Sequence, residues 1–532
     1  APSGEFDAMM NVPLIDDTLA LRAVGYIQRS GGYVDDARIG KKDSNAATTS
    51  GGRLALTLKP DDIWTVTANF AILHIRAQDS QYYIQGSQTF VRDTYLREPH
   101  ADNFFAAAMT ARAAFHWAQF TTATSYVDRR LNDRYDATLA WPDLTGFALG
   151  KSPFNVKRHI RAFTNETRLV STGMGRWQWL AGLYLSHRDE DLLSNLTGPN
   201  AAGAQISARK EKRADNADEA ALFGEATYAP TDWLSVTAGG RVSFISRHVL
   251  ANVGGLAPAD NIHLDLKNAT HGFAPKLVVA VTPVPNTTLY TQYTQGYRFG
   301  GINVDAPAGA VFDKDDKSAH GDTSFDSDVL HNYEIGAKWS GFNGRLIANG
   351  AVYFTDWKNV QTDQIAANGG YFIANAGTVH DLGAELDIAA RPWNDLTIRG
   401  NAFWNNAEIN HPNPLLTSNE GVLPGAPKMS FAISARYDFP LAQDWDGFAS
   451  VTYSYVGKSH LGFDQNSAAN GGYHLTNLRM GIMRQSWSLT LFVDNVTDNK
   501  ANTFAFGNPF NQNSQTTPPR PRTIGLTLTA NQ

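Results

Sequence analysis

The chain has 532 residues, of which 42% are hydrophobic and 11% aromatic, with a net charge of −6 and no cysteine. The missing cysteine excludes disulfides and thiolate metal sites. The balance of 45 basic and 51 acidic side chains gives no reason to expect a nucleic-acid partner. The longest apolar runs are far shorter than the roughly 18 residues of a membrane-spanning helix, so the length fits either several soluble domains or one large all-β assembly.

Short turns between alternating segments recur along the whole chain. Each turn is rich in Pro, Asp, Asn or Gly, and long polar segments join one hairpin to the next. The sequence predicts ten short turns: at 14–18, Pro60, 116–118, 173–176, Pro230, 283–286, 340–344, Pro392, 440–446 and 483–486. Ten hairpins and a last strand at 521–530 predict 21 antiparallel strands, with short and long connections in strict alternation.

The strands of these hairpins have one apolar and one polar column. Equivalent positions of three hairpins place Val66, Val236 and Ile398 in the apolar column. The neighbouring positions place Thr67, Thr237 and Arg399 in the polar column. A period of two residues indicates strands whose two faces meet different media.

Tryptophan gathers near the predicted short turns. Nine of the twelve tryptophans lie in or close to them: Trp64, Trp117, Trp177, Trp179, Trp233, Trp339, Trp393, Trp445 and Trp487. Indole prefers the boundary between hydrocarbon and water, so this distribution is typical of an aromatic belt around a membrane barrel. The alternative is that these tryptophans only pack hairpin ends in a soluble β protein.

Two all-β architectures contain strand units that repeat regularly along the chain. A β-propeller has four strands per unit and apolar residues on both faces of its central strands. This chain has two strands per unit and a consistently polar face, which favours one large antiparallel transmembrane β-barrel with a polar lumen, short periplasmic turns and long extracellular loops. Backbone groups in lipid are satisfied only in helices or closed barrels, so we expect the barrel to close.

Segments along the chain resemble the barrel of TonB-dependent outer-membrane receptors of Gram-negative bacteria. They are VPLIDDTLALRAVGYIQRSGGYVDD (12–36), 165–186, 221–243, LYTQYTQGYRFGGIN (289–303), 332–361, 375–392, LPGAPK (423–428), 488–500 and 519–529. The family barrel has 22 strands, and residues 5–14 resemble its second strand. We therefore expect residues 1–532 to be the barrel domain, with the N-terminal plug and the first strand absent from this chain and two sheet edges left unpaired.

The resemblance implies a receptor for active transport and not an enzyme, located as a multi-pass protein in the bacterial outer membrane. It implies a ferric siderophore or similar iron chelate as the imported solute, with a carbohydrate or aromatic nutrient, or a plugless porin-like channel, as alternatives. The implied partners are outer-membrane lipid, the small-molecule ligand and the TonB–ExbB–ExbD energy-coupling system, reached through a plug that is upstream in the gene or on a separate chain. No cofactor or nucleic acid is implied.

Two long connections offer aromatic side chains to a ligand. QYYIQG contains Tyr82 and Tyr83, and LAWPDL contains Trp141. An exposed aromatic side chain on a loop stacks a planar ligand well, although loop aromatics also pack loops together. We therefore treat these three residues as candidate ligand contacts.

The motif GYRFGGIN is the sharpest candidate at the base of a loop. It contributes Tyr297, Arg298, Gly300, Gly301 and Asn303. The planar fork of Arg298 suits an anionic ligand. The alternative is that the glycines bend the strand inward and that Arg298 pairs with a lumen carboxylate.

Other polar clusters give weak signals. DKDDKSAHGD at 313–322 lacks the spacing of a calcium loop and predicts a solvated loop. His100, His116 and His460 have no paired metal spacing. Ser459 and His460 are adjacent, but no acidic partner for a catalytic site is identifiable, so neither a metal site nor a catalytic site is predicted.

Overall fold

The computed structural model describes residues 1–84, 86–87, 89–173, 175–257, 261–304, 306, 323–366, 368–416, 421–463, 469–504, 507–510 and 515–531. The segment at 313–322, for which the sequence predicts a solvated loop, lies outside these residues. The described chain is nearly all β-structure, and its α-helix α1 (Trp141–Thr145) lies in a long connection. In the part of the chain described, no helix is long and apolar enough to cross a membrane.

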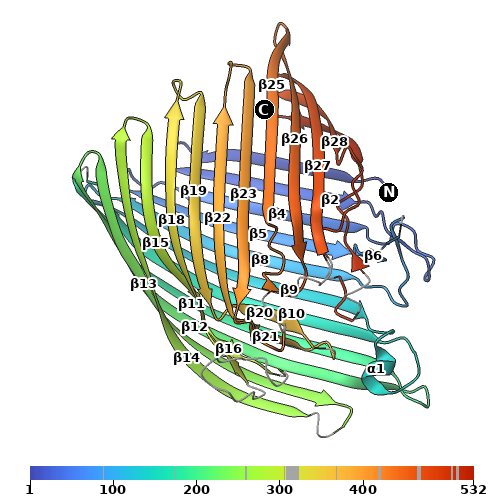
Figure 1. The fold of residues 1–532 in the computed structure, drawn as a ribbon. Coiled ribbons are helices and arrows are strands. Elements are labelled where there is room, and N and C mark those ends of the chain that lie inside the picture. Colours follow the sequence, from blue (N-terminus) through green and yellow to red (C-terminus); the bar gives the residue numbers. More distant parts are fainter. Residues whose placement is uncertain are drawn as a thin grey trace.

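One sheet of 22 strands forms the body of the molecule, and successive long strands pair antiparallel. Figure 1 shows the sheet curving round, so that the first strands of the chain lie behind the last ones. All but the two-residue β24 (Gly421–Val422) are long, in agreement with the 21 strands predicted from the sequence. The long strands are β1 (Gly4–Ile15), β2 (Leu19–Ser30), β4 (Ala47–Leu58), β5 (Trp64–Ala77), β8 (His100–Ala114), β9 (Ala118–Asp136), β10 (Pro153–Ser171), β11 (Trp177–Pro199), β12 (Gln205–Thr231), β13 (Leu234–Gly255), β14 (Ile262–Val284), β15 (Thr287–Arg298), β18 (Asp328–Gly341), β19 (Leu346–Lys358), β22 (Thr378–Ala390), β23 (Leu396–Asn410), β25 (Met429–Ala442), β26 (Trp445–His460), β27 (Ala469–Arg484), β28 (Trp487–Asp494) and β30 (Thr523–Ala530).

All ten short turns lie where the sequence predicts them, and the long connections alternate with them. Asp17, Asn286 and Asp444 occupy turn positions with φ of 56°, 63° and 66°. Asn and Asp tolerate this left-handed backbone better than other side chains, because their short polar groups bond to the local backbone. The turn residues therefore fix the registers of the hairpins that they join.

In the described parts of the long connections, four small sheets form. They pair β3 (Asp35–Asp36) with β7 (Val91–Arg92), β6 (Tyr83–Ile84) with β29 (Gln515–Thr516), β16 (Gly301–Ile302) with β17 (Ser324–Phe325), and β20 (Gln361–Ile365) with β21 (Tyr371–Asn375). The pair of β6 and β29 joins the connection after β5 to the last connection of the chain. Long connections that are far apart in sequence therefore pack together over one end of the sheet.

The two faces of the sheet differ in polarity as predicted. Large apolar side chains of the outward column are exposed, for example Leu222 and Phe244, at 65% and 59%. In the inward column the side chains bond to one another across strands, as Thr227 does to Thr237 at 2.7 Å. Seven of the nine turn tryptophans are more than a third exposed: Trp117, Trp177, Trp179, Trp233, Trp339, Trp393 and Trp487.

The strands β1 and β30 form the two edges of the sheet. Among the described pairings, β1 pairs with β2 alone and β30 with β28 alone, so these two strands do not close the sheet on each other. The reason is the odd number of long strands, which makes β1 and β30 run in the same direction and prevents antiparallel pairing between them. The sequence-based expectation of two unpaired edges is confirmed. The side chain of Arg520 still joins their outer ends, with Nη2 at 2.5 Å from Ser3 Oγ and 3.3 Å from the Gly31 carbonyl.

The buried apolar clusters lie at the end of the sheet where the long connections gather. One cluster, built around Trp141, Phe154 and Leu196, packs α1 against the outer ends of β10 and β11. Another, around Val379 and Ile409, packs the connections that follow β19 and β23. The interior of the sheet is instead lined by polar side chains, so the buried apolar packing lies among these connections and not in a central core.

Candidate ligand site

Arg298 ends β15 on the inward face and is held by the neighbouring strand. Its Nε lies 2.9 Å from Asp328 Oδ2, and Nη2 also bonds to this carboxylate and to the Gln361 carbonyl at 2.8 Å. The guanidinium lies 5.1 Å from the ring of Trp357. Asp328 is 2% exposed, whereas Arg298 is 50% exposed. The structure thus shows the pairing with a lumen carboxylate that the sequence leaves as one alternative, and one face of the guanidinium still meets the interior.

Gly300 and Gly301 allow a close approach of backbone and side chains. A Cβ on Gly300 would collide with the Phe325 carbonyl oxygen, and one on Gly301 would collide with Arg247 Nη1 and the Phe325 ring. Asn303 is 4% exposed and bonds to both backbone groups of Ile373 at 2.9 Å. These residues therefore tie the connection after β15 to β21.

Tyr297 packs beside Phe299 with ring centroids 5.0 Å apart. Its hydroxyl is buried and, in the described structure, has no hydrogen-bond partner. A buried hydroxyl without a partner costs free energy, so this group has an unused capacity to donate or accept. Contact of the GYRFGGIN residues with a ligand stays a prediction.

Tyr82 and Tyr83 are not the exposed pair that the sequence suggests, because they are only 4% and 5% exposed. Tyr82 donates a hydrogen bond to Glu98, and Tyr83 donates to the Lys500 carbonyl at 3.3 Å. Burial raises the pKa of Tyr82 well above its usual range. Both side chains hold loops together in this structure, and their contact with a ligand stays a prediction.

A buried charged cluster surrounds Tyr82, and sequence reasoning missed it. Arg92 is 0% exposed and lies 3.3 Å from Asp36, 3.1 Å from Asp79 and 2.7 Å from Glu98. Burial raises the pKa of Asp79 and of Glu98, while the Arg92 charge opposes this rise. One guanidinium therefore joins the connections after β2 and β5. No local pattern identifies it, since its partners come from separate segments.

Trp141 is also buried, at 0% exposure, although the sequence suggests a loop aromatic open to ligand. Its Nε1 donates to the Pro199 carbonyl at 3.1 Å, and its ring packs in the cluster with Phe154 and Leu196. The side chain anchors α1 to the wall. Its contact with a ligand also stays a prediction.

An arginine group on the inward faces of β10, β11 and β12 was also not singled out from the sequence. Glu190 is shared by Arg188 and by Arg158, whose Nε lies 3.1 Å away. Glu211 is likewise shared by Arg209 and Arg213, at 3.0 and 3.8 Å. In the outer stretch of these strands (153–162, 186–199 and 205–217), four inward arginines face three inward carboxylates, Glu190, Glu211 and Asp215. The alternating charges of Arg209, Glu211 and Arg213 were the sequence pattern from which this group could have been predicted.

Among the described residues, the contacts of Ser459 and His100 do not form a catalytic site or a metal site. Ser459 Oγ donates to the Asn470 side-chain oxygen, which does not act as a general base. His100 Nδ1 lies 2.5 Å from Asp133, a single carboxylate. Among the described residues, no group of three or more His, Cys, Asp or Glu is arranged to hold a metal ion.

The strand order, the two faces and the packed long connections match a known receptor fold. A family model for "TonB dependent receptor-like, beta-barrel" matches residues 11–496. The chain belongs to this family. As a TonB-dependent receptor barrel it spans the bacterial outer membrane, with its outward column toward lipid and its inward column around the lumen. The family comprises transport receptors, so the enzyme alternative is set aside.

Solved structures share the fold of this TonB-dependent receptor barrel. The ferric yersiniabactin uptake receptor FyuA from Yersinia pestis has a TM-score of 0.84 and 17% identity, over 99% of this chain and 78% of that chain. The siderophore receptor PiuA from Acinetobacter baumannii has a TM-score of 0.79 and 14% identity, over 99% and 79%. The copper transporter OprC has 0.71 and 13%, over 99% and 78%. At these identities the likeness establishes the fold and leaves the solute open.

Proposed function

We propose that this receptor barrel imports a ferric siderophore or a similar iron chelate, driven by the TonB–ExbB–ExbD system. The inward arginine group at the outer half of the lumen supports this most directly. Arg158 and Arg188 are 35% and 45% exposed, and their shared Glu190 neutralises only one of them. Chelates that hold Fe³⁺ through deprotonated oxygens are often anionic, and guanidinium forks bind such oxygens in pairs.

The GYRFGGIN residues form the proposed second contact region. Arg298 presents a half-exposed guanidinium beside Trp357, and the Tyr297 hydroxyl is available for a new hydrogen bond. Gly300, Gly301 and Asn303 would shape the loop base. Tyr82, Tyr83 and Trp141 remain proposed contacts that need the loops to open first.

We further propose that a plug and one more strand complete this barrel domain of residues 1–532. The parallel edges β1 and β30 would each gain an antiparallel neighbour from a single strand placed between them. The reach of the Arg520 side chain to Ser3 limits the width of the seam at its outer end. The gene sequence upstream of Ala1 tests this proposal, because it either encodes a plug in frame or leaves the plug to another chain.

Growth under iron limitation tests the import proposal. Deletion of the gene is expected to slow growth on the cognate ferric chelate, and an Arg158→Gln, Arg188→Gln receptor is expected to bind that chelate more weakly. A defect seen only on a carbon source would instead favour a carbohydrate or aromatic nutrient. A persistently open conductance of the intact gene product in planar bilayers would favour a porin-like channel.

A further inference from the structure

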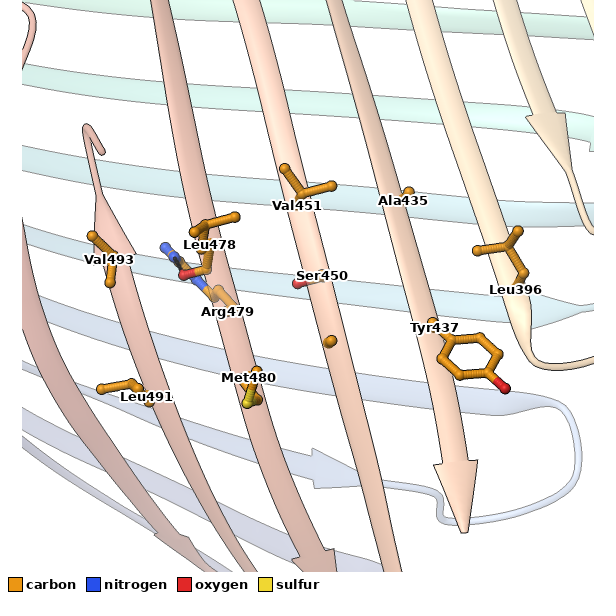
Figure 2. A pocket seen from close by; sticks show the side chains of 11 residues that line it. Leu396, Ala435, Tyr437, Ser450, Val451, Leu478, Arg479, Met480, Leu491 and Val493 are labelled. Carbon is orange, nitrogen blue, oxygen red and sulfur yellow. Dashed lines mark hydrogen bonds between the residues drawn. The ribbon is translucent and has the colours of Figure 1, made fainter. Parts of the chain in front are cut away.

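An apolar groove crosses the lipid-facing side of β23 to β28 near their short turns. Figure 2 shows side chains that line it, including Tyr437, Val451 and Met480, and the lining comes from β23, β25, β26, β27 and β28. The small residue Ala449 lies between Tyr437 and Met480 in the strand register, and Ala435 lies beside Val451. Two small side chains among larger ones create a groove with a volume of about 400 Å³.

A single cation lies below this groove, toward the turns. Arg484 is the last residue of β27 and continues the outward column of Met480 and Ile482. It pairs with Trp487 in the register, and its guanidinium lies 5.4 Å from the ring of Trp445. Among the described strand residues, no other charged side chain occupies the outward column at the short-turn end, and no described carboxylate pairs with Arg484.

The distance between cation and groove matches one lipid leaflet. Met480 lies four residues from Arg484 and Leu478 lies six, which is roughly 13 and 20 Å along a strand. With a strand tilt of about 40°, these positions lie about 10 and 15 Å above Arg484. Half of a hydrocarbon core of about 30 Å is about 15 Å. The groove therefore extends from the periplasmic interface to the middle of the membrane.

We propose that Arg484 and this groove bind one phospholipid of the periplasmic leaflet, with its phosphate on Arg484 and an acyl chain in the groove. The exposed guanidinium at the end of an apolar face lies where lipid headgroups lie, and phosphate accepts its fork through two oxygens. Trp445 and Trp487 flank the cation at the depth where indole prefers to lie. The small side chains of Ala435 and Ala449 leave room for methylene groups of an acyl chain. A surface of uniformly large side chains would not provide this room.

Native mass spectrometry of the purified, detergent-solubilised chain, titrated with phosphatidylglycerol, tests the site. We expect one retained lipid, bound about five-fold more weakly by Arg484→Gln, since one basic side chain contributes about 1 kcal/mol to anionic-lipid binding. Ala449→Phe fills the groove and is expected to reduce retention while it keeps the cation. Arg399→Gln is the matched control, because Arg399 also lies near a short turn, between β22 and β23, but faces the lumen. Arg484→Lys is expected to restore part of the binding.

Equal retention by wild type and Arg484→Gln would overturn the proposal, as would an equal loss in Arg399→Gln. If the wild type were a dimer and Ala449→Phe a monomer that still retained the lipid, the groove would be the contact with a second copy. That result would also overturn the proposal. Sheet content by circular dichroism verifies that each variant is folded. Because the groove faces lipid, a negative result leaves the import proposal untouched.

Discussion

The buried Arg92 cluster provides a sharp test of how the outer loops are held. Arg92→Met keeps most of the side-chain volume and removes the charge that faces Asp36, Asp79 and Glu98 at 2.7 to 3.3 Å. Removing one partner of a buried ion pair typically costs about 3–5 kcal/mol. The wall of the barrel does not contain these residues, so we expect this cost in the free energy of loop opening and not in unfolding of the sheet.

The cost depends on pH with a defined sign. Burial raises the pKa of Asp79 and of Glu98, and loss of the Arg92 charge raises both further. A carboxyl whose pKa is higher in the folded state stabilises it at low pH, and this contribution is lost as pH rises through the folded pKa. The deficit of Arg92→Met is therefore expected to be largest at neutral pH and to shrink as the pH falls toward the ordinary carboxyl pKa of about 4.

Hydrogen exchange of amides in residues 78–99, corrected for intrinsic rates at each pH, measures this opening. Arg97→Met is the matched control, because Arg97 is 45% exposed and its Nε lies 3.7 Å from Asp79. Such an exposed pair contributes at most about 1 kcal/mol. If Arg92→Met opened the loop no more than Arg97→Met, or if its deficit did not change with pH, the reasoning would be refuted.

Three further substitutions test the wall and the loop base. Leu222→Arg places a charge on the lipid face and is expected to lower the free energy of unfolding in lipid vesicles by up to about 2–4 kcal/mol; Thr237→Arg, which faces the lumen, should cost clearly less, and similar costs would contradict the assignment of faces. Gly301→Ala places a methyl group against Arg247 and the Phe325 ring, so ligand affinity and the melting temperature should both fall. Unchanged values of both would contradict the close approach of these side chains to Gly301. Trp141→Ala should cost about 3–5 kcal/mol, measured as faster exchange in residues 137–152, and a silent variant would show that the ring is not an anchor.

Local chemistry explains why so much of the wall could be predicted. A turn such as the one at Asn286 depends only on neighbouring residues. Along each strand, apolar and polar side chains alternate between the lipid face and the lumen face, as Val236 and Thr237 do. Strand number, turn positions and the two faces therefore follow from the sequence. The unpaired edges followed as well, because an odd count alone makes the first and last strands parallel.

The burial of the loop aromatics could not be predicted in this way. Tyr83 bonds to a carbonyl 417 residues away, and Arg92 collects carboxylates from two connections. Such contacts exist only after the sheet has curved and brought its long connections together, so no local period encodes them. The sequence by itself determined the long strands, their short turns and the two faces of the sheet. Tertiary structure alone decided that Tyr82 and Trp141 hold loops in place, and that Arg484 lies beneath an apolar groove.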